Sequence, residues 1–350
     1  MAPSGKYIWV DYLRLIATFS VVFLHSAAPL LKKYHELPEE YWMTGNIYDS
    51  LVRMCVPLFF MISGLLLLGR SEPLKVFFSK RMDKVLVPLI AWSLIYVFWE
   101  AYYEGSEAIS FSSFYNILLE PAYYHLWYLY AIIGVYLFLP ILRVIIDKTD
   151  HNLLHYYLLL WFVAVAIIPI GENITQVSSE IDLFSISAYS GYLVLGFVIG
   201  KMQISKKIAI SALFIFIISA AVTATGTYLL TVRNDGVFSE YFYGYMTPNV
   251  ILMSTSMFIL TKYFISKVDA FASDRMLSIL KSFSAASFGI YLIHPIFLYL
   301  LEVGDLGIVI SGFEGNPAIS IPVTAVTTFF LSYVTILLLK KVPVVNKISP

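Results

Sequence analysis

Residues 8–25 read IWVDYLRLIATFSVVFLH, an apolar segment that carries an arginine at Arg14 and a histidine at His25. A helix turns about 100° and rises about 1.5 Å per residue, so eleven steps bring His25 back to within about 20° of Arg14 and about 16 Å along the axis. Asp11 lies three residues before Arg14, near the same face. Ionisable groups inside a membrane helix are costly and usually face a cavity or a partner. The segment therefore predicts a polar path that runs partway through a membrane.

The composition of the whole chain agrees with a membrane setting. Apolar residues make up 59% of the 350 residues and charged residues only 13%, which is too few charges to cover a soluble domain of this length. About 20 apolar residues cross the ~30 Å hydrocarbon core. We therefore expect an all-α integral membrane protein, a bundle of about ten transmembrane helices in a single domain over 1–350. The spans are expected at 8–30, 46–68, 85–103, 124–143, 153–170, 185–201, 207–230, 247–265, 283–301 and 318–339.

Basic residues are distributed unevenly between the two sides of this predicted bundle. If the N-terminus is cytoplasmic, that side carries all of the 23 basic residues except Lys32, Lys33, Arg53 and Arg233. Cytoplasmic loops of membrane proteins are enriched in Lys and Arg. We therefore expect both termini in the cytoplasm, and a multi-pass protein of the cell inner (plasma) membrane that is surrounded by membrane lipids.

Several function classes lack support in the sequence. The single cysteine, Cys55, lies within a span and cannot form an intrachain disulfide. No Cys/His spacing resembles a zinc site, and no Gly-rich phosphate loop is present. We expect no metal and no nucleic-acid partner, and the sequence does not indicate the oligomeric state.

The most basic loop lies between the second and third predicted spans, and its core reads KRMDK over 80–84. Arg81 and Lys84 are three residues apart, so they share a face if this stretch is helical. Such a cluster can hold phosphate groups. It can equally be topological charge in contact with lipid headgroups, and the spacing alone leaves both interpretations open.

Three histidines are expected to lie in the outer half of the membrane. His25 is two-thirds of the way along the first span, and His125 begins the fourth span from the outer side. His294 follows Lys281 by about 20 Å of helix in the ninth span. A membrane histidine can simply be a hydrogen-bonding group between helices. Three histidines at one depth, above a buried arginine, favour a functional site.

These segments resemble the membrane acyltransferase-3 family, the bacterial integral-membrane O-acyltransferases that act on surface glycans. Arg14 and His25 are similar to the family's Arg/Lys-x10-His motif. The resemblance continues in the family's order to about residue 340. Its other segments are PLFFMISG at 57–64, KRMDK at 80–84, HLWY at 125–128 and FGIYLIHP at 288–295. One position departs from the pattern. Lys84 stands where the family has a second arginine, and lysine keeps the charge but loses the bidentate fork.

The resemblance implies transfer of an acyl group, most simply acetyl, from cytoplasmic acyl-CoA to a hydroxyl of an extracytoplasmic glycan or lipid-linked sugar. His25 and Arg14 would be catalytic. Imidazole suits a base that accepts the hydroxyl proton, because its pKa lies near working pH. The donor, acetyl-CoA or another acyl-CoA, would be bound by Arg14, Lys80, Arg81 and Lys84. The acceptor would be bound by His125, Trp127, Tyr128 and His294.

These placements predict one cavity across most of the bundle, narrow and basic on the cytoplasmic side and wider and aromatic outside. His25 should stand where the two parts meet, with His294 on the same wall. Two other classes of function remain open. Buried charge also suits a transporter or flippase of a small molecule or lipid-linked sugar, with Arg14 and His25 as an ion or proton relay. The third is a non-catalytic anchor of a polysaccharide assembly complex.

Overall fold

The computed structural model describes residues 7–104, 117, 119–175, 188–268, 273–342 and 345–349. All regular secondary structure in these ranges is helical. Nine of the described helical stretches are long and apolar enough to cross a membrane. The prediction of an all-α, multi-pass membrane bundle is confirmed, whereas the side on which each terminus lies stays a prediction.

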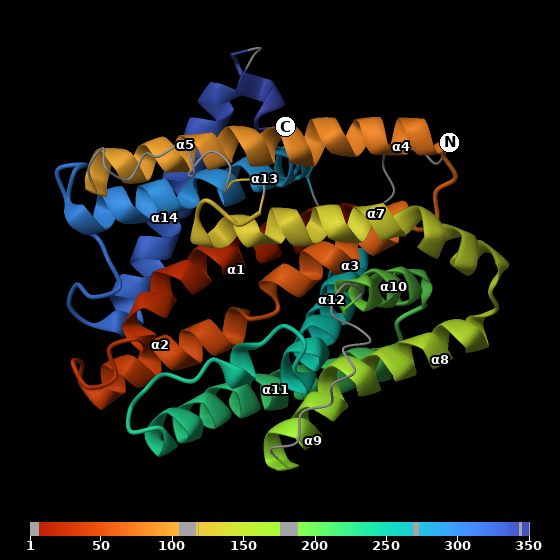
Figure 1. The fold of residues 1–350 in the computed structure, drawn as a ribbon, viewed down its shortest axis with the longest axis horizontal. Coiled ribbons are helices and arrows are strands. Elements are labelled where there is room, and N and C mark those ends of the chain that lie inside the picture. Colours follow the sequence, from red (N-terminus) through yellow and green to blue (C-terminus); the bar gives the residue numbers. More distant parts are fainter. Residues whose placement is uncertain are drawn as a thin grey trace.

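The helices follow one another along the chain without strands between them in the described residues (Figure 1). Their bounds are α1 Ile8–Leu31, α2 Glu39–Val52, α3 Cys55–Leu67, α4 Leu74–Arg81, η1 Met82–Leu86, α5 Val87–Glu104, η3 Tyr124–Leu126, α7 Trp127–Lys148, α8 His151–Phe162, η4 Val163–Ile167, α9 Ile168–Thr175, α10 Ala188–Lys201, α11 Lys206–Arg233, η5 Tyr241–Tyr243, α12 Pro248–Val268, α13 Asp274–Val303, α14 Pro317–Leu339 and η7 Val345–Lys347.

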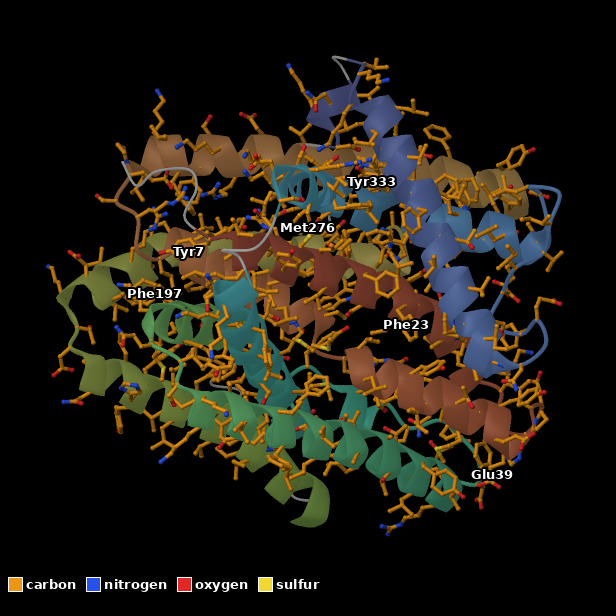
Figure 2. All side chains as sticks on the ribbon, turned by 180° about the vertical axis from the view of Figure 1, so that it is seen from behind. Tyr7, Phe23, Glu39, Phe197, Met276 and Tyr333 are labelled. Carbon is orange, nitrogen blue, oxygen red and sulfur yellow. The ribbon has the colours of Figure 1, made fainter. Side chains whose placement is uncertain are left out.

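Helix α1 is the central helix of the bundle. It contacts α2, α3, α12, α13 and α14, and in Figure 1 it lies between α5, α13 and α14 on one side and α8, α9 and α11 on the other. Leu13 and Ala17 on its surface are fully buried. Figure 2 shows Tyr7, just before α1, and Glu39, at the start of α2, toward opposite ends of the molecule. The Arg14–His25 stripe therefore lies in the middle of the bundle, where several helices can contribute to a site.

The predicted spans differ from the observed helices in two places. The sixth span, predicted over 185–201, is described only as the 14-residue α10, and residues 185–187 lie outside the described part. The second span is interrupted at Arg53 and Met54, which separate α2 from α3. In contrast, Pro295 does not end α13, which runs without a break from Asp274 to Val303.

Helices α3 and α10 approach each other closely through two glycines. A Cβ atom built at Gly64 would overlap the Leu193 backbone, and one at Gly196 would overlap the Met61 backbone. Small residues allow membrane helices to pack at short distances, where van der Waals contact is the main attraction. Gly64 is the last residue of the PLFFMISG segment, so this segment fixes the α3–α10 contact.

The Gly64→Ala substitution should destabilise the protein by about 1–3 kcal/mol, because the methyl group would meet a backbone that cannot rotate away. The measurement is the unfolding temperature of the purified protein in detergent. Gly134→Ala in α7 is the matched control, because its methyl group would have no atom within 4 Å. Equal unfolding temperatures for the two variants would contradict this account of the α3–α10 contact.

Candidate active site

A cavity of about 360 Å³, here called the basic cavity, lies among α1, α4, α7 and α13. Three of the four residues predicted to bind a donor line it together: Arg14, Arg81 and Lys84. Aromatic side chains complete its wall, including Tyr128, Tyr136 and Tyr291. The cavity therefore joins the predicted phosphate cluster to the arginine of α1.

The local helix geometry explains why Arg81 and Lys84 share this cavity. Residues 80–84 are helical, which is the condition under which Arg81 and Lys84 were expected to share a face. Helix α4 continues at Met82 into the π-helical turn η1. Single π-turns inside helices are frequent at functional sites. Lys80 does not line the cavity. Its Nζ lies 3.0 Å from Glu72 Oε2, and its side chain is half exposed.

Glu72 binds three basic side chains at the edge of the basic cavity. Its Oε1 atom lies 3.1 Å from Arg143 and 3.7 Å from Arg81, while Oε2 accepts from Lys80. Burial raises the pKa of Glu72, but the hydrogen bonds from Lys80 and Arg143 outweigh it and lower the pKa below its usual value. One ionised carboxylate thus faces three cations, which leaves a local excess of positive charge.

Arg143 of α7 is a residue of this cluster that the sequence did not indicate. Its Nε donates to the Leu67 carbonyl at 2.8 Å. The buried Phe77 ring lies 4.8 Å from the Arg143 guanidinium and 5.0 Å from that of Arg81. Arg143 and Arg81 therefore share Glu72 and the Phe77 ring, and no spacing along the chain connects these two helices.

Arg14 is paired and yet faces the cavity. Its Nη1 lies 3.5 Å from Asp11 Oδ1, and Asp11 also accepts a 2.6 Å hydrogen bond from Ser284 of α13. The i,i+3 spacing on α1 produces the ion pair. The Arg14 side chain remains 36% exposed, so part of its guanidinium is available to a bound anion.

The three predicted histidines come together from α1, η3 and α13. The His25 and His294 rings stack with their centroids 5.3 Å apart, and the His125 ring lies edge-on at 5.4 Å from His294. Tyr124 lies 4.8 Å from His25. His294 is fully buried and His125 almost so. The structure therefore brings the three rings together, while their depth in the membrane and their chemical roles stay predictions.

The pockets described for this chain do not show the predicted single cavity, which stays a prediction. His25 lines a separate pocket of about 30 Å³, here called the histidine pocket, which shares no lining residue with the basic cavity. Tyr291 lines the basic cavity and lies 5.3 Å from the His125 ring and 6.1 Å from His294. We call Tyr291, His125 and His294 the histidine layer. This layer separates the two volumes, and the outer volume is the narrower one.

The aromatic residues predicted to hold an acceptor do not form one surface. Tyr128 lines the basic cavity, on the other side of the histidine layer from His25. Trp127 stacks on Tyr245 at 5.6 Å and lies 6.0 Å from Tyr189. Neither residue lines the histidine pocket. In the described ranges, no group of three or more His, Cys, Asp or Glu side chains is placed to hold a metal ion.

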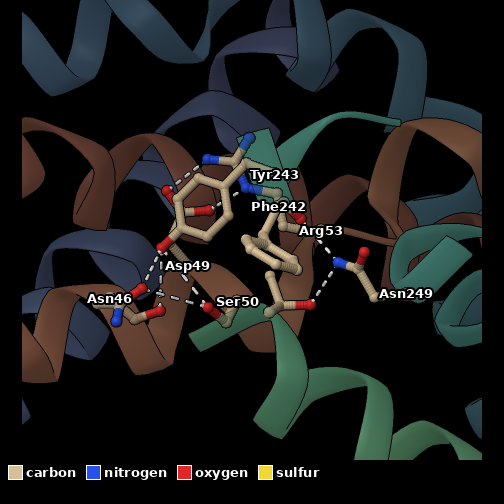
Figure 3. Close-up of polar contacts among 8 residues, drawn as sticks. Asn46, Asp49, Ser50, Arg53, Phe242, Tyr243 and Asn249 are labelled. Atoms are coloured by element: carbon tan, nitrogen blue, oxygen red, sulfur yellow. Dashed lines mark hydrogen bonds and ion pairs between the residues drawn. The ribbon is translucent and has the colours of Figure 1, made fainter. Parts of the chain in front are cut away.

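Arg53 was expected on the outer side, within the second predicted span, and the structure adds a buried partner for it. It ends α2 inside the bundle, where its guanidinium pairs with both oxygens of the fully buried Asp49 (Figure 3). The Tyr243 ring lies 3.9 Å from the guanidinium, and the Tyr243 hydroxyl donates to Asn46 at 2.6 Å. The i,i+4 spacing of Asp49 and Arg53 within an apolar stretch was the available signal. These contacts hold the break between α2 and α3 in place next to η5, which contains Tyr243.

The described chain is thus a helical membrane bundle with a basic cavity and a buried histidine cluster. The family model described as "Acyltransferase domain" matches residues 7–337. The chain therefore belongs to this acyltransferase family, as its motifs predicted.

Curated proteins similar to this chain come from Staphylococcus aureus and Enterococcus faecalis. The chain is 26% identical over 311 residues to a protein described as a probable poly-beta-1,6-N-acetyl-D-glucosamine export protein, covering 82% of this chain and 81% of the relative. A shorter match, 31% identical over 141 residues, joins 38% of this chain to 18% of an amino-acid racemase of Enterococcus faecalis. No solved structure matches the chain.

Proposed function

We propose that this protein is an O-acyltransferase of the cell inner (plasma) membrane. It transfers an acyl group, most simply acetyl, from cytoplasmic acyl-CoA to a hydroxyl of an extracytoplasmic glycan or lipid-linked sugar. The observation that carries the proposal is the meeting of the basic cavity and the histidine cluster across Tyr291. The family match supports acyl transfer, and the names of the relatives support a glycan acceptor.

The basic cavity suits the donor. Coenzyme A carries phosphates at one end and its thioester at the end of a long, thin arm. The phosphates would bind Arg81 and Lys84, whose charges exceed what Glu72 neutralises. The arm would extend past Arg14 toward Tyr291, and the thioester would reach the histidine layer. This direction makes the Lys84 side of the bundle cytoplasmic.

The reaction then needs a base on the acceptor side of the layer. The acceptor oxygen attacks the thioester carbonyl, the new C–O bond forms, and the C–S bond breaks. His25 accepts the hydroxyl proton, and the departing thiolate finally takes up one proton to become the free thiol. General-base catalysis of this kind contributes about 10²–10⁴-fold. No metal is part of this proposal.

The proposal is tested with purified protein, acyl-CoA and oligomers of poly-beta-1,6-N-acetyl-D-glucosamine as the acceptor. We expect release of free thiol together with an acylated oligomer detected by mass spectrometry. Protein that binds acyl-CoA in the basic cavity but consumes no thioester with any glycan hydroxyl would overturn the assignment as an acyltransferase.

The Arg81→Ala, Lys84→Ala double variant should raise the KM for acyl-CoA by about 100-fold or more, because two charge-assisted contacts are removed at ~1.5–3 kcal/mol each. The KM for the acceptor should remain unchanged. Higher salt should weaken donor binding to the unaltered protein, because exposed charges are screened. Lys75→Ala is the matched control, since Lys75 is an exposed lysine of α4 that does not line the cavity. An unchanged KM for acyl-CoA in the double variant would show that Arg81 and Lys84 do not bind the donor and serve only as topological charge.

Glycan export is the second candidate, and the printed name of the Staphylococcus aureus relatives favours it. Export requires a path wide enough for a sugar chain between the two sides of the membrane. The described cavities are separated by the histidine layer, which favours transfer of an acyl group over passage of a glycan. Vesicles that accumulate glycan without acylating it would support export instead.

A further inference from the structure

Pro295 determines which nitrogen of His294 carries the proton. In a helix the N–H of residue 295 would donate to the carbonyl of Tyr291, but proline has no N–H. That carbonyl lies 2.7 Å from His294 Nδ1. A carbonyl only accepts hydrogen bonds, so Nδ1 must be the protonated nitrogen and donate to it. The neutral His294 ring therefore has a lone pair on Nε2.

This lone pair on His294 Nε2 is buried and accepts no hydrogen bond from the described residues. His294 is fully buried, and its Nε2 has no hydrogen-bond partner among the described residues. His125 repeats the pattern, because its Nε2 donates to the Leu292 carbonyl at 3.3 Å and its buried Nδ1 has no partner within the same ranges. Unsatisfied buried polar atoms are rare and costly. The histidine layer therefore contains two nitrogen lone pairs, on His294 Nε2 and His125 Nδ1, that accept no hydrogen bond from the described residues. Either nitrogen could accept a proton.

His294 also lies between the two sides of the proposed reaction. Its ring is 5.3 Å from the His25 ring and 6.1 Å from Tyr291, which lines the basic cavity. A proton taken from the acceptor by His25 must end on the thiolate on the donor side. His294 is placed on the route between them.

We propose, on the basis of the proposed function, that His294 is a catalytic proton carrier that protonates the leaving thiolate. The hydroxyl proton passes to His25, then through one water to Nε2 of His294, and from Nε2 to sulfur. The acceptor oxygen has then exchanged its hydrogen for the acyl group, and coenzyme A leaves as the thiol. Throughout, the Nδ1–H bond to the Tyr291 carbonyl keeps Nε2 as the atom that gains and loses the proton.

The test compares two donors that differ in their need for protonation. An acyl-CoA leaves as a basic thiolate, whereas the S-acetyl ester of 4-nitrothiophenol leaves as a stable anion. His294→Gln should lower kcat about 100-fold or more with acyl-CoA, but less than tenfold with the aryl thioester. His25→Ala should be impaired with both donors, because the acceptor hydroxyl still needs a base. An equal loss in His294→Gln with both donors, or no loss with either, would overturn the relay.

The tautomer provides a second, independent measurement. With ¹⁵N-labelled histidine, the NMR signals of His294 should show Nδ1 protonated and Nε2 unprotonated in the unaltered protein. Pro295→Ala restores a backbone N–H that competes for the Tyr291 carbonyl. It should produce a mixture of tautomers and lower kcat with acyl-CoA while the donor KM is retained. A protonated Nε2 in the unaltered protein would refute the relay even if the variants are inactive.

The two proposals fail in different ways. If the unaltered protein transfers no acyl group from acyl-CoA, the proposed function is wrong, whatever the state of His294. If it does transfer the group, and His294→Gln is as active as the unaltered protein with both donors, only the relay is wrong. Unfolding temperatures of the variants separate either outcome from misfolding.

Discussion

His25→Ala should reduce acyl transfer by about 10²–10⁴-fold while the protein still inserts and folds. His25 lies on the central helix, stacks on His294, and lines the histidine pocket. Alanine keeps the helix but leaves no group to accept the proton of the attacking hydroxyl. The measurement is kcat for glycan acylation, together with the size and unfolding temperature of the purified variant.

The matched control for this substitution is His35→Ala. His35 is exposed in the segment after α1, and its ring bonds to the Asp235 carbonyl at 2.8 Å and not to the histidine cluster. It should retain near-complete activity. If a correctly folded His25→Ala protein has the turnover of the His35→Ala variant, His25 is not the base. The alternative function as a transporter or flippase would then be favoured again.

Arg53→Ala should lower the free energy of unfolding by about 3–5 kcal/mol, because Asp49 would remain fully buried without its partner. The same substitution removes the cation that packs on the Tyr243 ring. The measurement is resistance to unfolding in detergent. The effect is on stability, so it should appear with or without substrates.

Two comparison variants define the origin of that loss. Arg233→Ala removes an exposed arginine at the end of α11 and should change stability little. The Arg53→Met, Asp49→Leu double variant removes both charges and should recover much of the stability, because an unpaired charge is then no longer buried. If Arg53→Ala is no less stable than Arg233→Ala, the pair does not hold the α2–α3 break.

The sequence predicted the features that depend on one helix at a time. Helical geometry placed Arg14 and His25 on one face of α1, and distance along α13 placed His294 at the depth of His25. The apolar runs predicted ten spans, and the described residues contain nine helical stretches that are long and apolar enough to cross a membrane. These predictions need only the rise and rotation of a helix and the thickness of a membrane.

Features that depend on packing between helices were not predictable in the same way. The pairing of Arg143 with Glu72 joins α7 to the loop before α4, with no signal in either segment. The division of the expected cavity arises because Tyr291, His125 and His294 fill the space above Arg14. Arg53 was expected within the second span, and its burial with Asp49 depends on the helices that pack around this pair.

The histidine layer also determines where an electrical potential across the membrane would fall. Water that enters the basic cavity and the histidine pocket brings the potential of each side close to the layer, so most of the voltage drops across a few side chains. Moving one elementary charge through the full potential is worth about 2.3 kcal/mol per 100 mV. A proton that crosses from His25 to a thiolate beside Tyr291 travels through this field. On the proposed mechanism, the rate of acyl transfer would therefore depend on the membrane potential.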